Sequence, residues 1–297
     1  MDVTTTFGLL NLDKPPGPTS HDLVARVRRG TGVRKVGHAG TLDPMATGVL
    51  VLCLGPATRL SEYVMASSKT YRAQVHFGVE TNTYDADGEV VAQNPDPVAE
   101  GDILAHLPEF QGEIAQVPPM YSAIKRGGKK LYELARAGAE VEREPRPVTI
   151  QRLDLLAWEP PVATLEIECS PGTYIRSLAQ DLGRALGVGA HLAGLERAAS
   201  GGFTVEDAVG WDEFAQAMED GTWPDYVLPP DVALLDMPVL HLDPPQAANV
   251  RNGIWVRVGD DHQPPNTLAR AYDAEGRFFA VLERRGSKWK PHKVFNV

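Results

Sequence analysis

Residues 37–50, which read GHAGTLDPMATGVL, form the segment that most constrains how this chain can fold. One acidic side chain, Asp43, lies there between glycines and Pro44, and the apolar run 49–54 follows directly. Glycine permits unusual backbone dihedral angles and Pro44 biases Asp43 towards extended backbone, so we expect a specified loop before a buried strand. Such a loop is typical of a backbone shaped around a ligand. On pattern alone, a lone aspartate in a turn is more often an ordinary residue that caps its own backbone.

The composition is that of an ordinary globular protein. The chain has 297 residues, of which 43% are hydrophobic and 23% charged, and this length allows one large domain or two smaller ones. No apolar run is long enough for a membrane span and the start does not resemble a signal peptide, so we expect a cytoplasmic protein without a membrane partner. Cys53 and Cys169 lie in apolar context far from histidine, which predicts buried thiols and no metal site.

Charge is unevenly distributed along the chain, whose formal net charge is −10. The segments 1–72, 73–120, 121–152, 153–200, 201–247 and 248–297 carry +4, −9, +4, −3, −10 and +4. An acidic protein is an unexpected partner for nucleic acid, but separate basic blocks can form a local positive surface that binds a polyanion. Charges that simply decorate solvated faces would give the same pattern, so composition leaves both interpretations open.

Hydrophobic periodicity predicts a mixed α/β region followed by a small β domain. Strands are expected at 7–12, 49–54, 71–77 and 165–169, and helices from Ser20 (as the N-cap) to the glycines at 30–32, at 175–186 and at 211–218. Pro229 and Pro230 mark a boundary, and short apolar runs at 238–242, 253–258, 267–272 and 278–282 predict an all-β unit. We therefore expect domains at 1–228 and 229–297.

Familiar cofactor and metal motifs are missing from the sequence. It contains no phosphate-binding loop, dinucleotide fingerprint, serine elbow or zinc-binding helix, so we expect neither cofactor nor metal. Residues 85–88, Asp-Ala-Asp-Gly, resemble the middle of a calcium loop. Thr83 and Asn94 occupy the two positions that would need carboxylates, and a hairpin turn is the expected structure.

Five motifs, in a fixed order along the chain, together resemble one known family. They are Leu12-Asp13-Lys14-Pro15-Pro16-Gly17-Pro18-Thr19-Ser20, Thr41-Leu42-Asp43-Pro44, Lys69-Thr70-Tyr71-Arg72, the segment 121–132 (YSAIKRGGKKLY) and Gly172-Thr173-Tyr174-Ile175-Arg176. From about residue 8 to 200, the chain resembles the TruB family of bacterial tRNA pseudouridine synthases, which modify uridine 55 in the T-arm.

The resemblance implies three catalytic residues. Asp43 matches the nucleophilic aspartate, Arg176 the arginine that pairs with it, and Tyr71 the aromatic residue that stacks on the flipped base. A carboxylate can form a covalent intermediate that divides a difficult step in two, and a neighbouring guanidinium favours its charged form. Extruding a base costs a few kcal/mol, and stacking on an aromatic ring returns roughly 1–3 kcal/mol. The isomerisation involves no redox step, which agrees with the expected absence of a cofactor.

Four further residues are implied in substrate binding. His38 matches the residue that enters the T-loop and takes the place of the extruded base, Tyr174 and Leu195 match residues of the base pocket, and Lys14 has a supporting role. Taken singly, these assignments have ordinary alternatives. Tyr71 fits a sheet aromatic, Arg176 a helix cap or a surface partner of Asp181, and His38 a solvent-exposed loop residue.

The resemblance also implies an architecture and a partner. It implies a pseudouridine-synthase fold, α/β with a central mixed and largely antiparallel sheet, in which residues 121–152 close over RNA. The tail resembles a PUA RNA-binding domain. The partner is the T-arm stem-loop of tRNA, and we expect a monomer. Glu196 stands where a basic residue is expected, and Asp260 and Asp261 make the tail locally less basic, so we expect weaker RNA contacts at both places.

Two other functions stay open from the sequence. One is a tRNA-folding chaperone for which chemistry is secondary, and an Asp43→Asn protein that still folds tRNA would reveal it. The other is a guide-dependent enzyme acting on ribosomal RNA, as in archaea and eukaryotes. The absence of a long basic extension argues against this second alternative.

Overall fold

The computed structural model describes residues 6–122, 124–126, 128–131, 141–259 and 263–296. A ten-stranded sheet forms the larger region of the chain, which is named the catalytic region for the expected catalytic residues that it contains. Its strands are β1 Gly8–Lys14, β2 Val36–His38, β3 Thr47–Leu54, β4 Lys69–Phe77, β7 Gly112–Gln116, β10 Arg146–Glu159, β11 Val162–Cys169, β12 Ala190–Ser200, β13 Phe203–Thr204 and β14 Val209–Gly210. The main path runs β14-β1-β3-β12-β4-β11-β10-β7, with β2 paired to β3 and β13 to β12.

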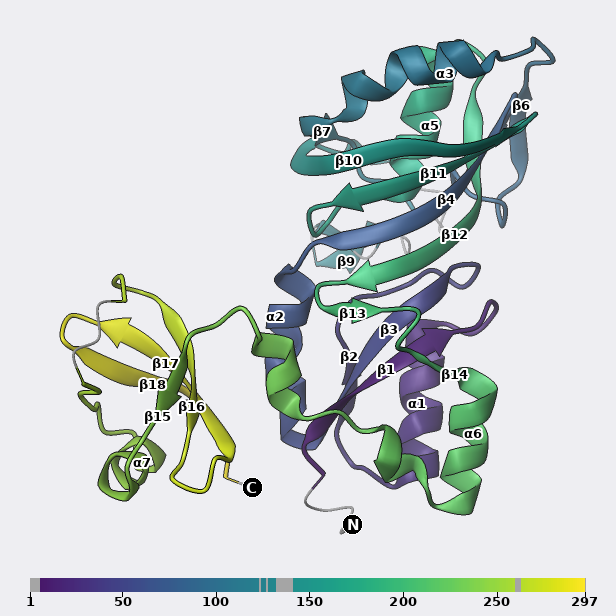
Figure 1. Cartoon of the computed structure of the whole chain (residues 1–297). Coiled ribbons are helices and arrows are strands. Elements are labelled where there is room, and N and C mark those ends of the chain that lie inside the picture. Colours follow the sequence, from purple (N-terminus) through teal and green to yellow (C-terminus); the bar gives the residue numbers. More distant parts are fainter. Residues whose placement is uncertain (1–5, 123, 127, 132–140, 260–262, 297) are drawn as a thin grey trace.

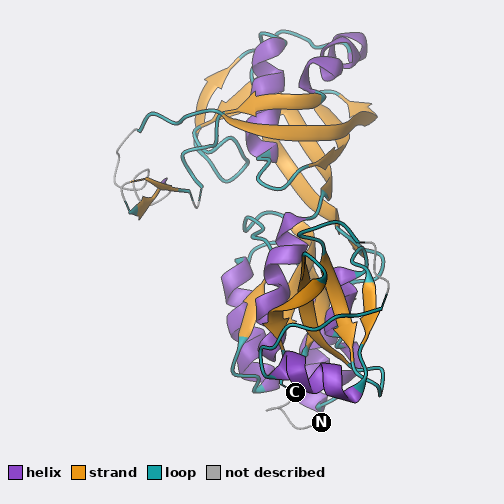
Figure 2. Cartoon of the chain, turned by 90° about the vertical axis from the view of Figure 1, so that its left-hand side faces the viewer, coloured by secondary structure: helices purple, strands orange, loops and turns teal. Residues whose placement is uncertain are grey.

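The sheet is mixed, and one of its two parallel pairs, β3–β12, lies at the junction of two halves. Along the main path, β1–β14 and β3–β12 are parallel and the other neighbours are antiparallel. Figure 1 shows one half, with β1, β2 and β3, beside α1 (Ser20–Thr31) and α6 (Trp211–Asp220). The other half carries α3 (Glu100–His106) and α5 (Ile175–Ala185), and Figure 2 shows both halves from the side. This architecture confirms the expected fold class.

The junction depends on close backbone approach. Gly48, at the start of β3, has φ +91°, and a Cβ atom there would lie 2.4 Å from the carbonyl oxygen of Arg197 on β12. A side chain at this position is therefore excluded by both the dihedral angle and the space. The loop that carries Asp43 leads directly into this contact, so the two halves of the sheet meet beside that loop.

The N-cap of helix α1 lies one residue earlier than expected. Thr19 is the N-cap, since its hydroxyl accepts from the amide of Asp22 at 3.1 Å while the Asp22 carboxylate accepts from the Thr19 amide at 2.9 Å. The prediction of Ser20 was wrong, because only Thr19 has an acidic residue three positions later to complete a capping box. Gly32, with φ 72°, ends the helix as expected.

The C-terminal region forms its own four-stranded sheet, β15-β16-β17-β18. The strands are β15 Val239–His241, β16 Leu268–Tyr272, β17 Phe278–Arg285 and β18 Lys288–Val294. The region also contains helix α7 (Pro244–Arg251), which the all-β prediction omitted, although Asp243 and Gln246 form a capping box. Residues 253–258, expected as a strand, form only an isolated bridge between Val256 and Trp289.

The two sheets pack through a shared apolar cluster. Leu60 and Phe7 come from the catalytic region, and Phe278, Val281 and Phe295 come from the C-terminal one. The short helix α2 (Ser61–Ala66) lies at this contact, which Figure 1 shows between the two bodies. Among the described helices, none is both long and apolar enough to cross a bilayer.

Two small hairpins lie outside the two larger sheets. In β5 (Val79–Thr81) and β6 (Val90–Gln93), antiparallel pairing confirms the hairpin expected around residues 85–88. The pair β8 (Lys125–Arg126) and β9 (Lys129–Lys130) lies in the segment expected to close over RNA. Of that segment, residues 123, 127 and 132–140 lie outside the described residues. Residues 146–152 belong to β10, so they are part of the central sheet and not of a closing loop.

Candidate active site

Asp43 and Arg176 form a direct ion pair. Asp43 lies in the loop between β2 and β3, and Arg176 lies in the first turn of α5. Arg176 Nε is 3.0 Å from Asp43 Oδ2, and the side chains are 7% and 37% exposed. An incoming molecule can therefore reach Asp43, whereas Arg176 is enclosed by the protein. A buried guanidinium holds a carboxylate more firmly than a solvated one does, because screening is weaker there.

Arg176 is itself fixed by three further partners. Its Nη1 lies 3.3 Å from Asp85 Oδ2 and donates to the carbonyl of Thr83 at 3.3 Å, while Nη2 donates to the carbonyl of Tyr121 at 2.9 Å. All three guanidinium nitrogens therefore have acceptors, which leaves the group little freedom to turn. Arg176 pairs with Asp43 and Asp85, so the alternative of a surface pair with Asp181 is wrong.

Asp85 is a buried second carboxylate that the sequence interpretation missed. Its side chain is 7% exposed, and its Oδ1 accepts from the hydroxyl of Thr83 at 2.5 Å and from the amide of Asp87 at 3.2 Å. Burial raises the pKa of Asp85, while Thr83 and Arg176 oppose that shift. Residues 85–88, whose sequence resembles part of a calcium-binding loop, therefore form a turn that places the Asp85 carboxylate against Arg176.

We expect Asp85→Asn to lower the catalytic rate constant by about tenfold, because Arg176 would lose one of the two carboxylates that orient it. The rate is measured at saturating RNA, and the melting temperature reports any loss of folding. Asp87→Asn is the matched control, since Asp87 is exposed in the same turn. An Asp85→Asn protein as fast as the Asp87→Asn protein would contradict this role.

The Lys14 side chain stabilises the loop that carries Asp43. It is fully buried, and its Nζ donates to the carbonyls of Pro15 at 3.0 Å, Pro44 at 3.0 Å and Ala46 at 2.7 Å. Burial lowers the pKa of Lys14 to about 8, with Asp43 acting in the opposite direction. The amine therefore bonds two backbone carbonyls of the loop directly after Asp43.

Arg197 also holds this loop through hydrogen bonds to its backbone. The sequence did not indicate this residue as part of the site. Arg197 is 2% exposed, and its Nε donates to the carbonyl of Val49 at 2.7 Å and its Nη2 to that of Gly40 at 3.1 Å. Its neighbour Glu196 is 3.1 Å from Arg72. The 195–197 segment thus holds the loop through Arg197, and Glu196 forms a half-exposed ion pair with Arg72.

Ser20 fastens the loop at a third point. Its hydroxyl accepts from the amide of Leu42 at 2.9 Å and donates to the Leu42 carbonyl at 3.1 Å. Because Ser20 is buried in the first turn of α1, this pair of bonds fixes the residue directly before Asp43 to the helix. With Lys14 and Arg197, side-chain hydrogen bonds hold the loop backbone before and after Asp43.

The residues expected around the base lie on neighbouring strands. Tyr71 on β4 and Leu195 on β12 are partly buried and pack against both apolar clusters of the catalytic region, at the junction of its halves. Tyr174 precedes α5, and its amide and carbonyl bond the side chain of Gln116 at 2.8 and 3.0 Å. Burial raises the pKa of both tyrosine hydroxyls, so both stay neutral at pH 7.

His38 ends β2 and is half-buried. Its ring lies 4.9 Å from that of His21, at an interplanar angle of 79°, in an edge-to-face contact. Burial lowers the pKa of His38, with the neighbouring His21 contributing to the shift, so a neutral imidazole is favoured. The ring is packed against α1 and is not a free solvent residue.

Comparison with known proteins identifies the family of this chain. Residues 28–175 match the family model described as TruB family pseudouridylate synthase (N terminal domain). Residues 176–235 match the tRNA pseudouridylate synthase B C-terminal domain, and residues 237–296 match tRNA Pseudouridine synthase II, C terminal. The chain belongs to the TruB family. The enzyme class expected from the five motifs, a pseudouridylate synthase, is thereby confirmed.

Relatives of this TruB-family chain share most of its length. The tRNA pseudouridine synthase B of Symbiobacterium thermophilum is 53% identical over 251 residues, which cover 83% of this chain and 82% of the relative. That of Dehalococcoides mccartyi, strain BAV1, is 45% identical over 290 residues, covering 97% and 96%.

A solved structure described as a Cbf5-Nop10-Gar1 complex contains a chain that is similar to this TruB-family protein in its three-dimensional structure. The match has a TM-score of 0.76 at 28% identity and covers 99% of this chain and 86% of the other. A second, an H/ACA RNP bound to a substrate RNA containing 2′-deoxyuridine, gives a TM-score of 0.76 at 26% identity, with 98% and 86% covered. Both matches extend over the C-terminal sheet as well as the catalytic region.

Proposed function

We propose that this TruB-family enzyme converts uridine 55 in the T-loop of tRNA to pseudouridine, with Asp43 as the nucleophile. The observation that carries the proposal is the 3.0 Å contact between the half-exposed Asp43 carboxylate and the buried Arg176 guanidinium. A nucleophile must be reachable from one side and held from the other, and this pair meets both requirements.

The chemistry needs no group beyond the protein and the RNA. The carboxylate of Asp43 forms a covalent bond to the uridine nucleotide, the N1–C1′ bond breaks, the base rotates, and C5 bonds to C1′. The bond to Asp43 then breaks and frees the carboxylate, while the proton lost from C5 is balanced by the proton that N1 takes up. Arg176 holds the attacking carboxylate in a fixed orientation through the Nε–Oδ2 contact. Lys14, Ser20 and Arg197 hydrogen-bond the backbone of the loop that carries Asp43. These bonds restrict the loop before the substrate binds, so the nucleophile is preorganised.

The base must leave its stack to reach Asp43, and the surrounding residues fit that step. Tyr71 supplies a neutral aromatic face for the flipped uracil, and Leu195 and Tyr174 close the pocket with apolar surface. His38, a neutral ring at the edge of the same loop, takes the stacking place that the extruded base leaves.

Relatives at 44–53% identity are named tRNA pseudouridine synthase B, and this name supports tRNA as the substrate. The guide-dependent alternative has weaker support, since the H/ACA and Cbf5-Nop10-Gar1 structures match at 26–28% identity. We further propose a cytoplasmic monomer with a catalytic domain at 1–228 and a PUA-like RNA-binding domain at 229–297. Leu228 pairs with Leu9 of β1 through two backbone hydrogen bonds, which supports a boundary directly after it.

The purified protein, incubated with an isolated T-arm stem-loop without added cofactor, should form pseudouridine at the loop uridine. Pseudouridine is mapped by site-specific chemical labelling and reverse transcription. A stem-loop with that uridine replaced by cytidine is the control. Absence of product in the uridine-containing RNA would overturn the proposed function.

A further inference from the structure

A basic ridge lies on the exposed side of α1 and the turn after it, outside the site described above. We define the ridge as Arg28, Arg29, Arg34 and Lys35, all of which are exposed. Across the described part of the chain, none of the four forms a salt bridge or a side-chain hydrogen bond. Arg26 on the same helix differs, since its guanidinium lies 5.6 Å from the Trp211 ring. The ridge therefore carries positive charge that the protein itself does not neutralise.

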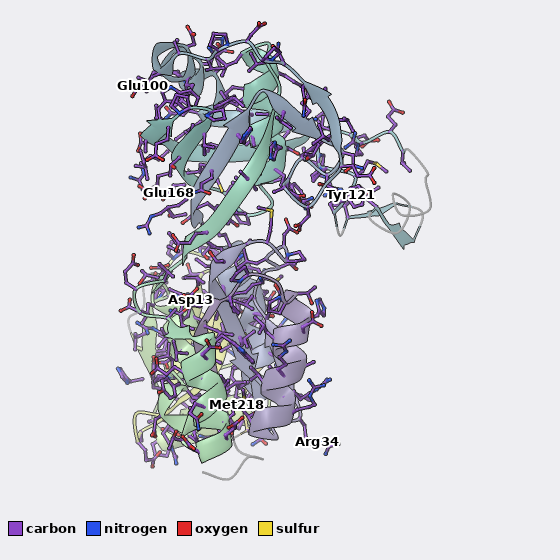
Figure 3. All side chains as sticks on the ribbon, turned by 90° about the vertical axis from the view of Figure 1, so that its right-hand side faces the viewer. Asp13, Arg34, Glu100, Tyr121, Glu168 and Met218 are labelled. Carbon is purple, nitrogen blue, oxygen red and sulfur yellow. The ribbon has the colours of Figure 1, made fainter. Side chains whose placement is uncertain are left out.

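The ridge is continuous with the active-site loop. His21, whose ring contacts His38, precedes Arg28 on the same face of α1 by about two helical turns, or roughly 10 Å. At the other end, Lys35 directly precedes β2, the strand that ends at His38. Figure 3 shows Arg34 and Tyr121 projecting from the same side of the molecule. The carbonyl of Tyr121 holds Arg176, so the ridge and the site share that side.

An acidic helix borders the ridge on its other side. Helix α6 exposes four carboxylates, at Asp212, Glu213, Glu219 and Asp220. It lies against α1, where a Cβ atom on Gly30 would meet the sulfur of Met218 at 2.4 Å, and Figure 3 labels Met218 beside that helix. A polyanion is repelled by α6 and attracted by the ridge, so the two helices together define one path for it.

We propose that the basic ridge binds backbone phosphates of the substrate RNA that lie outside the T-loop. The inference rests on the proposed function, because His38 is the point from which the RNA continues towards the ridge. Exposed, unpaired arginines on a helix beside the reacting loop match the chemistry of phosphate contacts, which fix register and orientation without reading sequence. The ridge would hold the RNA while the loop extrudes one base.

The test compares two charge-matched variants. Arg28→Gln with Arg34→Gln removes two ridge charges, and Arg152→Gln with Arg184→Gln removes two exposed charges elsewhere in the catalytic region. Dissociation constants for an intact tRNA transcript and for the isolated T-arm stem-loop are measured from about 50 to 300 mM salt. We expect the ridge variant to bind intact tRNA about tenfold more weakly, with a slope of log Kd against log salt reduced by about 1.5 to 2. The control should retain the wild-type slope.

The two RNAs distinguish the source of the phosphates. If the ridge variant binds both RNAs more weakly, the contacted phosphates lie in the T-stem. If it binds only intact tRNA more weakly, the phosphates lie in another arm. Unchanged affinity and slope for intact tRNA, in a variant with a wild-type melting temperature, would overturn the inference. The proposed function fails separately, if wild-type protein forms no pseudouridine in the same tRNA.

Discussion

Replacing Asp43 with asparagine should abolish pseudouridine formation, with a loss of at least about four orders of magnitude in the single-turnover rate constant. Asparagine keeps the shape and can still accept a hydrogen bond from Arg176, but its neutral amide cannot serve as the nucleophile. The dissociation constant for tRNA should change by less than about threefold, since a single half-exposed carboxylate adds little to a binding surface built from phosphate contacts. Rates are followed by tritium release from C5-labelled uridine in the tRNA.

The Asp43→Asn protein also separates chemistry from chaperoning. Arg176 keeps Asp85 as a partner in this variant, so the fold should persist and its melting temperature should lie close to that of Asp87→Asn. Undiminished tRNA folding by the inactive protein would show that a chaperone function exists beside the isomerase. A pseudouridine rate near that of wild type would remove Asp43 from the mechanism.

Much of the fold could be predicted because its signals are local. The apolar run at 49–54 became β3, buried on both faces, and the alternation at 165–169 became part of β11. The sequence also contains the signal for the N-cap of α1, since Thr19 and Asp22 form a capping box that Ser20 and Leu23 cannot form. The same signal at Asp243 and Gln246 marks α7, which the all-β interpretation of the tail overlooked.

Asp85 and Arg197 could not be predicted as site residues, because their roles depend on contacts between distant segments of the chain. Asp85 reads as an ordinary turn residue until the fold brings it to Arg176 on α5, and no local pattern records that meeting. Arg197 follows a leucine and a glutamate on an exposed-looking strand, yet the parallel pairing of β12 with β3 buries it beside the Asp43 loop. The pattern of a sequence shows which residue types are available, whereas burial and pairing decide which of them act.

Arg176→Lys should lower the single-turnover rate constant by about a hundredfold to a thousandfold while leaving the affinity for tRNA nearly unchanged. Lysine retains the positive charge, so a purely electrostatic role would survive the substitution. A single ammonium group cannot reproduce the planar fork that places Nε on Asp43 and the other two nitrogens on Asp85, Thr83 and Tyr121.

The size of that loss tests whether orientation or charge is the main contribution of Arg176. Removing one preorganised donor from a reacting centre typically costs 10²–10³ in rate, and misplacement by about 1 Å costs a similar factor. Arg184→Lys, on the exposed end of the same helix, is the matched control and should behave as wild type. An Arg176→Lys enzyme within about threefold of the Arg184→Lys rate would show that charge alone suffices, and that the bridge between the two carboxylates does not position Asp43 for attack.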